Sequence, residues 1–279
     1  MRILRESFVG VQGPMSHQLK RSSEAIDLRL VRGWIAEAGR IALSHCHQVD
    51  VRFKSDGTPT TTADREVEVF LLDRISGRYP HHQIIAEEGG VHAGNQEFVW
   101  VIDPIDGTRA FASGLPIWGI SIGVLWCGEP YAGAFFMPAL GEMYWGSSEG
   151  AFCNGRPMLR HSSMNFDNPL AFMVVPSNAH QVYEIDFPRA RSLGSTAAHL
   201  IYVAGGTAIG ALTRRVRIWD IAGVLPILEQ TGSTLVYLSG ESFQARNLLN
   251  GCLAAEPIVA AHFSLIERVR TSFQVRQQQ

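Results

Sequence analysis

Carboxylates that directly follow short apolar runs constrain the fold of this chain more than any other feature. The run Phe98–Ile102 is followed at once by the motif Asp-Pro-Ile-Asp-Gly-Thr at residues 103–108. We expect the apolar run to form a buried strand, and the proline and glycine to form a turn after it. Such a strand delivers two carboxylates to one edge of a sheet. The sequence therefore predicts a sheet whose edge carries an acidic cleft.

Other acidic residues stand at similar positions beside turn-forming residues: Asp64, the pair Glu87 and Glu88, and Asp220. Each taken alone is equally typical of a helix cap or a solvated turn. Gathered in one cleft, they would repel each other by several kcal/mol and take up protons unless cations neutralised them. Oxygen ligands without His or Cys favour Mg²⁺ over zinc, and this many carboxylates favour more than one ion.

Periodicity predicts helices that cover a largely antiparallel sheet, followed by alternating strands and helices. Helices are expected over 24–47, 64–77, 197–204 and 221–230, and strands over 83–86, 98–102, 117–126, 131–136, 142–145, 171–175 and 234–237. A polar stretch at 162–169 suggests a boundary. We expect an N-terminal α+β subdomain over 24–165 that carries most of the metal ligands, and a C-terminal α/β subdomain over 166–279. Residues 1–23 are expected to be flexible.

Charge and hydropathy argue against several classes of protein. The chain has 24 Lys and Arg against 26 Asp and Glu, a net charge of −2. It therefore lacks the basic excess of a protein whose main ligand is nucleic acid. No apolar run reaches the roughly 20 residues of a membrane span, and the four cysteines are scattered, which favours reduced thiols. We expect a cytoplasmic protein that acts on a small molecule.

Four motifs together resemble the signature set of the inositol monophosphatase family, which comprises lithium-sensitive, Mg²⁺-dependent phosphatases. They are DGTPTTTAD at 56–64, EE at 87–88, DPIDGT at 103–108 and WDIAG at 219–223, in the family's order and spacing over roughly residues 30–245. The resemblance implies an α/β fold, an αβαβα sandwich of the inositol monophosphatase and fructose-1,6-bisphosphatase type, usually assembled as a homodimer. It also implies hydrolysis of a phosphate monoester by metal-activated water with two or three Mg²⁺ ions.

The resemblance further implies roles for individual residues. The implied metal ligands are Glu87, Asp103, the carbonyl of Ile105, Asp106 and Asp220, with Asp103 shared by two ions. Glu87 and Thr108, with Asp64 behind Thr108, would hold the attacking water. The implied substrate-binding residues are Gly107, Thr108, Gly194, Ser195, Thr196, Thr213 and Asp220. Lys54 lies on a segment that resembles the family's mobile loop, and we expect it to stay exposed.

One departure from the family pattern concerns the substrate. Inositol-specific members have a glutamate seven positions before the WD aspartate, where this chain has Thr213, followed by Arg214, Arg215 and Arg217. A basic rim would favour a leaving group with a second anionic group, while a solvated basic loop is the alternative. The leading hypothesis is hydrolysis of inositol monophosphate or a related polyol or sugar phosphate. Histidinol phosphate, fructose 1,6-bisphosphate, a 3′-phosphoadenosine nucleotide and a catalytically silent regulatory protein are the alternatives.

Overall fold

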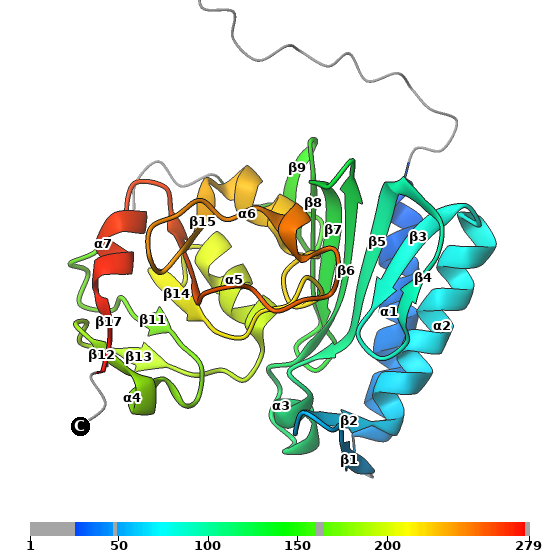
Figure 1. Ribbon diagram of the computed structural model, residues 1–279, viewed down its shortest axis with the longest axis horizontal. Helices are drawn as coiled ribbons and strands as arrows, with labels where there is room; N and C mark the ends of the chain where they lie inside the picture. The colour runs from blue at the N-terminus through cyan, green and yellow to red at the C-terminus, as the bar shows by residue number, and fades with distance from the viewer. Residues whose placement is uncertain (1–25, 47–48, 160–164, 277–279) are drawn as a thin grey trace, which may run out of the picture.

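Five alternating layers of helix and sheet make up the chain (Figure 1). The computed structural model describes residues 26–46, 49–159 and 165–276. The layers are helices α1 (Leu28–His45) and α2 (Thr62–Arg78), an eight-stranded sheet, helices α5 (Thr196–Ala204) and α6 (Leu225–Thr231), a five-stranded sheet, and helices α4 (Ala179–Val182) and α7 (Ile266–Thr271). The predicted αβαβα sandwich is confirmed.

The first two helices form because their apolar residues recur at helical spacing and because capping side chains fix their starts. Asp27 accepts a hydrogen bond from the N–H of Arg29 at the start of α1. At the start of α2, Thr61 and Asp64 form a reciprocal capping box. Both helices were predicted, and their observed ends lie within a few residues of the predicted ones among the described residues. The capping box places Asp64 at the inner end of α2, facing the sheet edge.

The eight-stranded sheet has the order β10-β9-β8-β7-β6-β5-β3-β4. Its strands are β3 (His82–Ala86), β4 (Gly90–His92), β5 (Asn95–Asp106), β6 (Gly119–Trp126), β7 (Glu129–Met137), β8 (Glu142–Ser147), β9 (Gly150–Cys153) and β10 (Arg156–Pro157). Only β3 and β5 pair in parallel among the described strands of this sheet, so Glu87 after β3 and Asp103 near the end of β5 come to the same edge.

Strand β5 continues through the motif that was predicted to be a turn. Its pairing with β6 shifts register between Asp103 and Asp106, which marks an irregularity inside the motif. The turn residue Gly107 and the short helix α3 (Thr108–Ala112) follow. A separate hairpin of β1 (Val51–Phe53) and β2 (Pro59–Thr61) packs against α3 at the lower end of the molecule in Figure 1.

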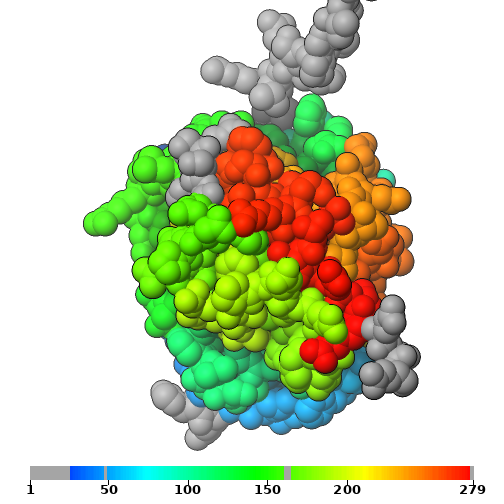
Figure 2. All heavy atoms as spheres, turned by 90° about the vertical axis from the view of Figure 1, so that its left-hand side faces the viewer, coloured from blue at the N-terminus to red at the C-terminus, as the bar shows by residue number. Residues whose placement is uncertain are grey.

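The five-stranded sheet has the order β13-β11-β14-β16-β15. The remaining elements are β11 (Met173–Val174), β12 (Tyr183–Ile185), β13 (Ala190–Arg191), β14 (Gly210–Thr213), β15 (Ser233–Tyr237), β16 (Ile258–His262), β17 (Phe273–Val275) and the 3₁₀ helix η1 (Ala245–Leu248). Strand β12 pairs with β17, so the green residues near 180 lie beside the red C-terminal residues in Figure 2.

The predicted helix over 221–230 begins too early. Residues 219–224 form turns and α6 starts at Leu225, with Pro226 in its first turn, where a missing N–H costs little. Asp220 consequently lies in a turn rather than beside a helix.

Helices α5 and α6 share one hydrophobic core with the eight-stranded sheet. The sheet contributes Ile85, Val101 and Phe135, among others, to this core. The two halves of the chain are therefore closely packed, and the subdomain boundary at 165/166 stays a prediction. The predicted flexible segment 1–23 lies outside the described residues, as does part of the polar stretch at 162–169. No helix within the described ranges is both long and apolar enough to cross a membrane.

Candidate active site

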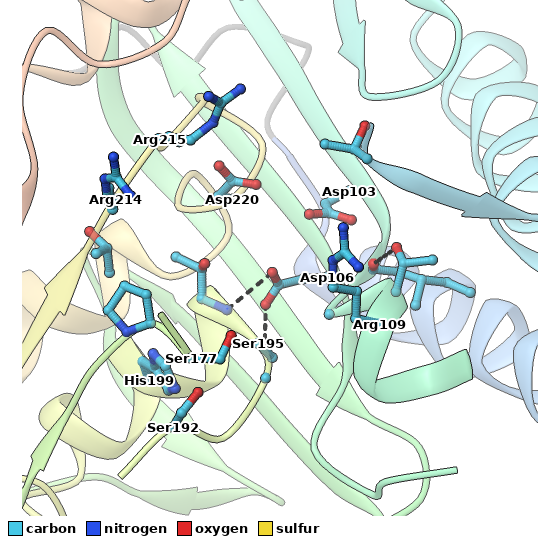
Figure 3. A pocket seen from close by; sticks show the side chains of 18 of the residues that line it. Asp103, Asp106, Arg109, Ser177, Ser192, Ser195, His199, Arg214, Arg215 and Asp220 are labelled. Carbon is cyan, nitrogen blue, oxygen red and sulfur yellow. Dashed lines mark hydrogen bonds between the residues drawn. The ribbon is translucent and has the colours of Figure 1, made fainter. Parts of the chain in front are cut away.

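Three aspartates from distant parts of the sequence meet between the two sheets. Asp103 and Asp106 come from β5, and Asp220 comes from the turn before α6. Each offers a carboxylate oxygen within 4.8 Å of the others. They line a pocket of about 350 Å³, shown in Figure 3, which is large enough for a small phosphate ester. This group of oxygens could hold a metal ion.

Asp103 is the least satisfied of these carboxylates. It is 2% exposed, and its Oδ1 has no hydrogen-bond partner among the described residues. Burial, together with the charges of Glu87, Asp106 and Asp220, raises the pKa of Asp103 well above its usual value. A buried oxygen without a donor is costly, and a cation would satisfy it. The donor set therefore fits a hard divalent ion.

Glu87 lies one residue beyond β3 and is held by Lys54. The Nζ of Lys54 is 2.9 Å from Oε1 of Glu87 and 2.6 Å from Oε1 of Glu88. The prediction that Lys54 stays exposed is wrong, because two adjacent glutamates draw its ammonium inward and leave its side chain 25% exposed. Burial lowers the pKa of Lys54, but both glutamates outweigh burial and raise it. Burial raises the pKa of Glu87, although Lys54 opposes this shift.

Asp64, Thr108 and Ile105 form a buried polar contact below the aspartates. The Oγ1 of Thr108 lies 3.2 Å from Oδ1 of Asp64 and 3.0 Å from the carbonyl oxygen of Ile105. The other oxygen of Asp64 accepts from the N–H of Thr61 at 2.8 Å. Burial raises the pKa of Asp64 to about 6 despite the hydrogen bonds from Thr61. The pair that was predicted to act together is thus in direct contact.

Asp106 links the two halves of the chain. Its carboxylate accepts from the hydroxyl of Ser195, from the N–H of Ala197 at 2.7 Å and from the N–H of Thr196 at 3.2 Å. Ser195 is also the N-cap of α5, accepting from the N–H of Ala198. Burial raises the pKa of Asp106 to about 6, although these donors oppose the shift. The contact holds the start of α5 against the end of β5.

Gly107 and Gly194 allow the two halves to approach closely. Gly107 has φ +92°, and a Cβ there would lie 2.9 Å from the carbonyl oxygen of Gly194. Gly194 has φ +100°, and its added Cβ would lie 2.8 Å from Cβ of Ala110. Both positions therefore require glycine. The absence of a side chain at Gly194 allows α3 to pack closely against it, and the predicted place of Gly194 beside the substrate stays a prediction.

Asp220 is partly buried and accepts from the N–H of Arg217 at 2.6 Å. Burial raises the pKa of Asp220 well above its usual value, more than this hydrogen bond lowers it. The guanidinium of Arg217 donates to the carbonyl of Gly251 and lies over the ring of Trp219. The prediction that Arg217 belongs to the basic rim is therefore wrong, because its charged group is occupied elsewhere. Arg214 and Arg215 do line the pocket.

A sequence profile identifies the family. The profile of the inositol monophosphatase family matches residues 27–274. This chain belongs to the inositol monophosphatase family. A histidinol-phosphatase of Chlorobaculum parvum is 34% identical over 218 residues, covering 74% of this chain and 83% of that protein. A fructose-1,6-bisphosphatase/inositol-1-monophosphatase of Thermotoga maritima is 29% identical and covers 84% of this chain and 95% of its own length.

Solved structures of the inositol monophosphatase family have the same fold. An inositol monophosphatase from Thermotoga maritima superposes with a TM-score of 0.76 at 26% identity, covering 88% of this chain and 95% of its own. The predicted resemblance is thus confirmed. The names of the family and of its members assign phosphatase activity, so the chain is a phosphoric monoester hydrolase.

Several residues at or beside this site were not predicted. Glu68 is 3% exposed and accepts from the N–H of Glu88 at 2.8 Å, and burial raises its pKa to about 7. Its position one helical turn after Asp64 is a signal that could have indicated it. The pocket is also lined by Arg109, Ser177 and His199, which carried no such signal, and by Ser192, which lies two residues before the predicted Gly194.

Proposed function

We propose that the chain hydrolyses a small phosphate monoester with Mg²⁺ ions held by Glu87, Asp103, Asp106 and Asp220 and by the carbonyl of Ile105. The observation that carries this proposal is the unpartnered, buried Oδ1 of Asp103 within a group of three aspartates. Oxygen-only donors in a water-accessible pocket are the ligands Mg²⁺ prefers. When bound, two or three such ions would supply the positive charge that lowers the pKa of water and stabilises the leaving oxygen.

The chain's own residues would place the attacking water. Thr108 presents its hydroxyl between Asp64 and the carbonyl of Ile105. The hydroxyl has a single hydrogen, which it donates to one of these two acceptors, and its lone pairs can accept a hydrogen bond from water. Asp64 is buried behind it, and its Oδ1 would accept the proton that the water gives up through the Thr108 hydroxyl. Glu87 would orient the same water from the other side.

The phosphate would be held by backbone rather than by side chains. Gly107 and Thr108 begin α3, and the N–H groups of a first helical turn lack intrahelical acceptors. We propose that these groups face the phosphate oxygens. Gly194, Ser195, Thr196, Thr213 and Asp220 would surround the leaving group.

The proposed leaving group is inositol or a related small polyol or sugar. Its pocket has several hydroxyl groups suited to a polyol, including those of Ser177, Ser192 and Thr196. Histidinol phosphate is a second candidate, because the relative from Chlorobaculum parvum carries that name. We further propose a cytoplasmic homodimer, as the family resemblance implies.

A substrate panel tests this function directly. Purified protein should release inorganic phosphate from at least one of inositol 1-phosphate, fructose 1-phosphate, fructose 1,6-bisphosphate, histidinol phosphate and a 3′-phosphoadenosine nucleotide. Release should require Mg²⁺ and should stop with a chelator. If no ester is hydrolysed in Mg²⁺, the proposal fails and the chain is a silent binding protein of the same fold.

A further inference from the structure

The two walls of the pocket differ in charge. The wall from residues 58–109 carries the carboxylates Glu87, Asp103 and Asp106. Its one arginine, Arg109, donates to the carbonyl of Gly57 at 3.3 Å. The wall from residues 176–220 contains a single acid, Asp220, which belongs to the proposed metal group. The same wall carries Arg214, Arg215 and His199 and several hydroxyls. The leaving group would therefore face donors and positive charge.

Arg214 and Arg215 are exposed and line this wall directly after β14. Figure 3 shows both on the same side of the pocket as Asp220. Within the described ranges, neither guanidinium makes a hydrogen bond or an ion pair with another residue. Arg217 differs, because its guanidinium is bound to a main-chain carbonyl. The first two arginines are thus free to bind an anion from the pocket.

His199 adds a neutral donor to the same wall. It is 5% exposed, and its Nε2 accepts from the N–H of Leu193 at 3.0 Å. An accepting Nε2 carries no proton, so the ring hydrogen must reside on Nδ1. Burial lowers the pKa of His199 to about 4, which keeps the ring neutral at physiological pH. Figure 3 shows the ring beside Ser177 and Ser192.

Thr213 provides no compensating acceptor on this wall. It is 3% exposed, and its hydroxyl donates to the carbonyl of Ile258 at 3.1 Å. A leaving group that bears an ammonium would meet two unpaired guanidinium groups and no carboxylate outside the metal group. A leaving group that bears a second anion would meet charge-matched donors.

We propose that Arg214, Arg215 and His199 form a subsite for a second phosphate on the leaving group. The subsite rests on the proposed function, because it presumes that the first phosphate lies at the aspartates. It predicts that sugar or polyol bisphosphates are better substrates than the matching monophosphates. It also predicts that histidinol phosphate, with its cationic amino group, is a poor substrate despite the relative that bears its name.

A matched pair of esters tests the subsite. Fructose 1,6-bisphosphate and fructose 1-phosphate share the ester at position 1 and differ in the second phosphate. We expect the wild-type kcat/KM for the bisphosphate to exceed that for the monophosphate by about tenfold or more, the size of one well-placed charge-assisted contact. The difference should lie mainly in KM and should shrink as salt is added, since exposed charges are screened.

The variant Arg214→Gln/Arg215→Asn should lower this ratio by about tenfold, within the same range of contact strength. Asn is chosen at 215 because that residue has φ +56°, a conformation Asn tolerates. Arg246→Ala removes an exposed charge outside the pocket and serves as the matched control. His199→Leu should lower the ratio, and His199→Gln should restore part of it by keeping an acceptor and a donor. Melting temperatures check that each variant folds.

Binding of fructose 6-phosphate, measured by calorimetry, gives a readout that does not need turnover. Wild-type protein should bind it more tightly than fructose, and the double variant should lose this preference. A ratio near one in the wild type, or an equal ratio in the wild type and the double variant, overturns the subsite while leaving the phosphatase intact. If no ester is hydrolysed in Mg²⁺, the proposed function fails. The calorimetric comparison then tests the subsite alone: a preference for fructose 6-phosphate that the double variant loses supports it, and a preference that the double variant keeps overturns it.

Discussion

Asp103→Asn is the sharpest test of the metal group, because this substitution keeps the size of the side chain and removes one charge. Asp103 is 2% exposed, and its Oδ1 lacks a donor among the described residues. If it is shared by two ions, the variant should lose turnover and most of its affinity for Mg²⁺ while keeping its fold. Without metal, the variant should be more stable than the wild type.

The size of both effects follows from the geometry. Two full charges within 4.8 Å of each other repel by at least about 3 kcal/mol at an effective dielectric of about 20. In the wild type, a proton on the carboxyl group relieves part of this repulsion, since the pKa of Asp103 is raised well above its usual value. We therefore expect the metal-free variant to be more stable by about 1 kcal/mol, or about 2–4 °C in melting temperature.

In Mg²⁺ the wild type should become the more stable of the two proteins. An ion that binds only the folded state at 100 times its Kd stabilises it by about 2.7 kcal/mol, which corresponds to about 5–10 °C for a domain of this size. The assay is thermal unfolding with a chelator and with millimolar Mg²⁺, alongside phosphate release. Asp73→Asn, at an exposed position on α2, is the matched control. Wild-type turnover in Asp103→Asn, or a Mg²⁺ shift equal to that of the wild type, would refute the bridging role.

Three further predictions test other parts of the site. The pKa values of Asp64 and Asp106 rise from 3.8 in the unfolded state to about 6 in the folded state, so the folded state binds more protons between these values. The contribution of these two groups to metal-free stability should therefore fall as pH rises from about 4 to about 6, and flat melting temperatures over this range would contradict it. Thr213→Glu should shift the kcat/KM ratio toward inositol monophosphate and away from bisphosphates by about tenfold, and a change under twofold would place residue 213 outside the leaving-group pocket. Gly107→Ala should destabilise the fold and abolish turnover, because its Cβ would lie 2.9 Å from the Gly194 carbonyl oxygen; a melting temperature equal to that of the wild type would refute this steric argument.

The layered fold was predictable because its signals are local. Apolar alternation predicted the central strands, and helical spacing predicted α1, α2 and α5 close to their observed bounds. The short strands β12, β13 and β17 were missed because two or three residues carry too little periodicity. The start of α6 was misplaced because the apolar residues of the preceding turns, including Ile221 and Ala222, are buried like those of a helix.

At the site, the sequence by itself determined most of the acids that cluster. Glu87, Asp103 and Asp106 lie at the end of a strand or just after it, and Asp64 lies in the first turn of a helix. The sequence also determined the family, since four motifs in fixed order are unlike chance patterns. It could not determine where charged side chains find partners. Lys54 binds Glu87 across 33 residues and also the adjacent Glu88. Asp106 receives its donors from the start of α5, across about 90 residues.

Only the tertiary structure decided which arginines face the pocket and that His199 is a neutral donor there. Arg214, Arg215 and Arg217 are nearly adjacent in sequence, yet the chain turns so that Arg217 binds the carbonyl of Gly251 while the other two line the pocket. The physical reason is that a hydrogen bond depends on distance and direction in space. Residues that are far apart in the sequence set this distance and direction, so a local sequence pattern cannot predict them.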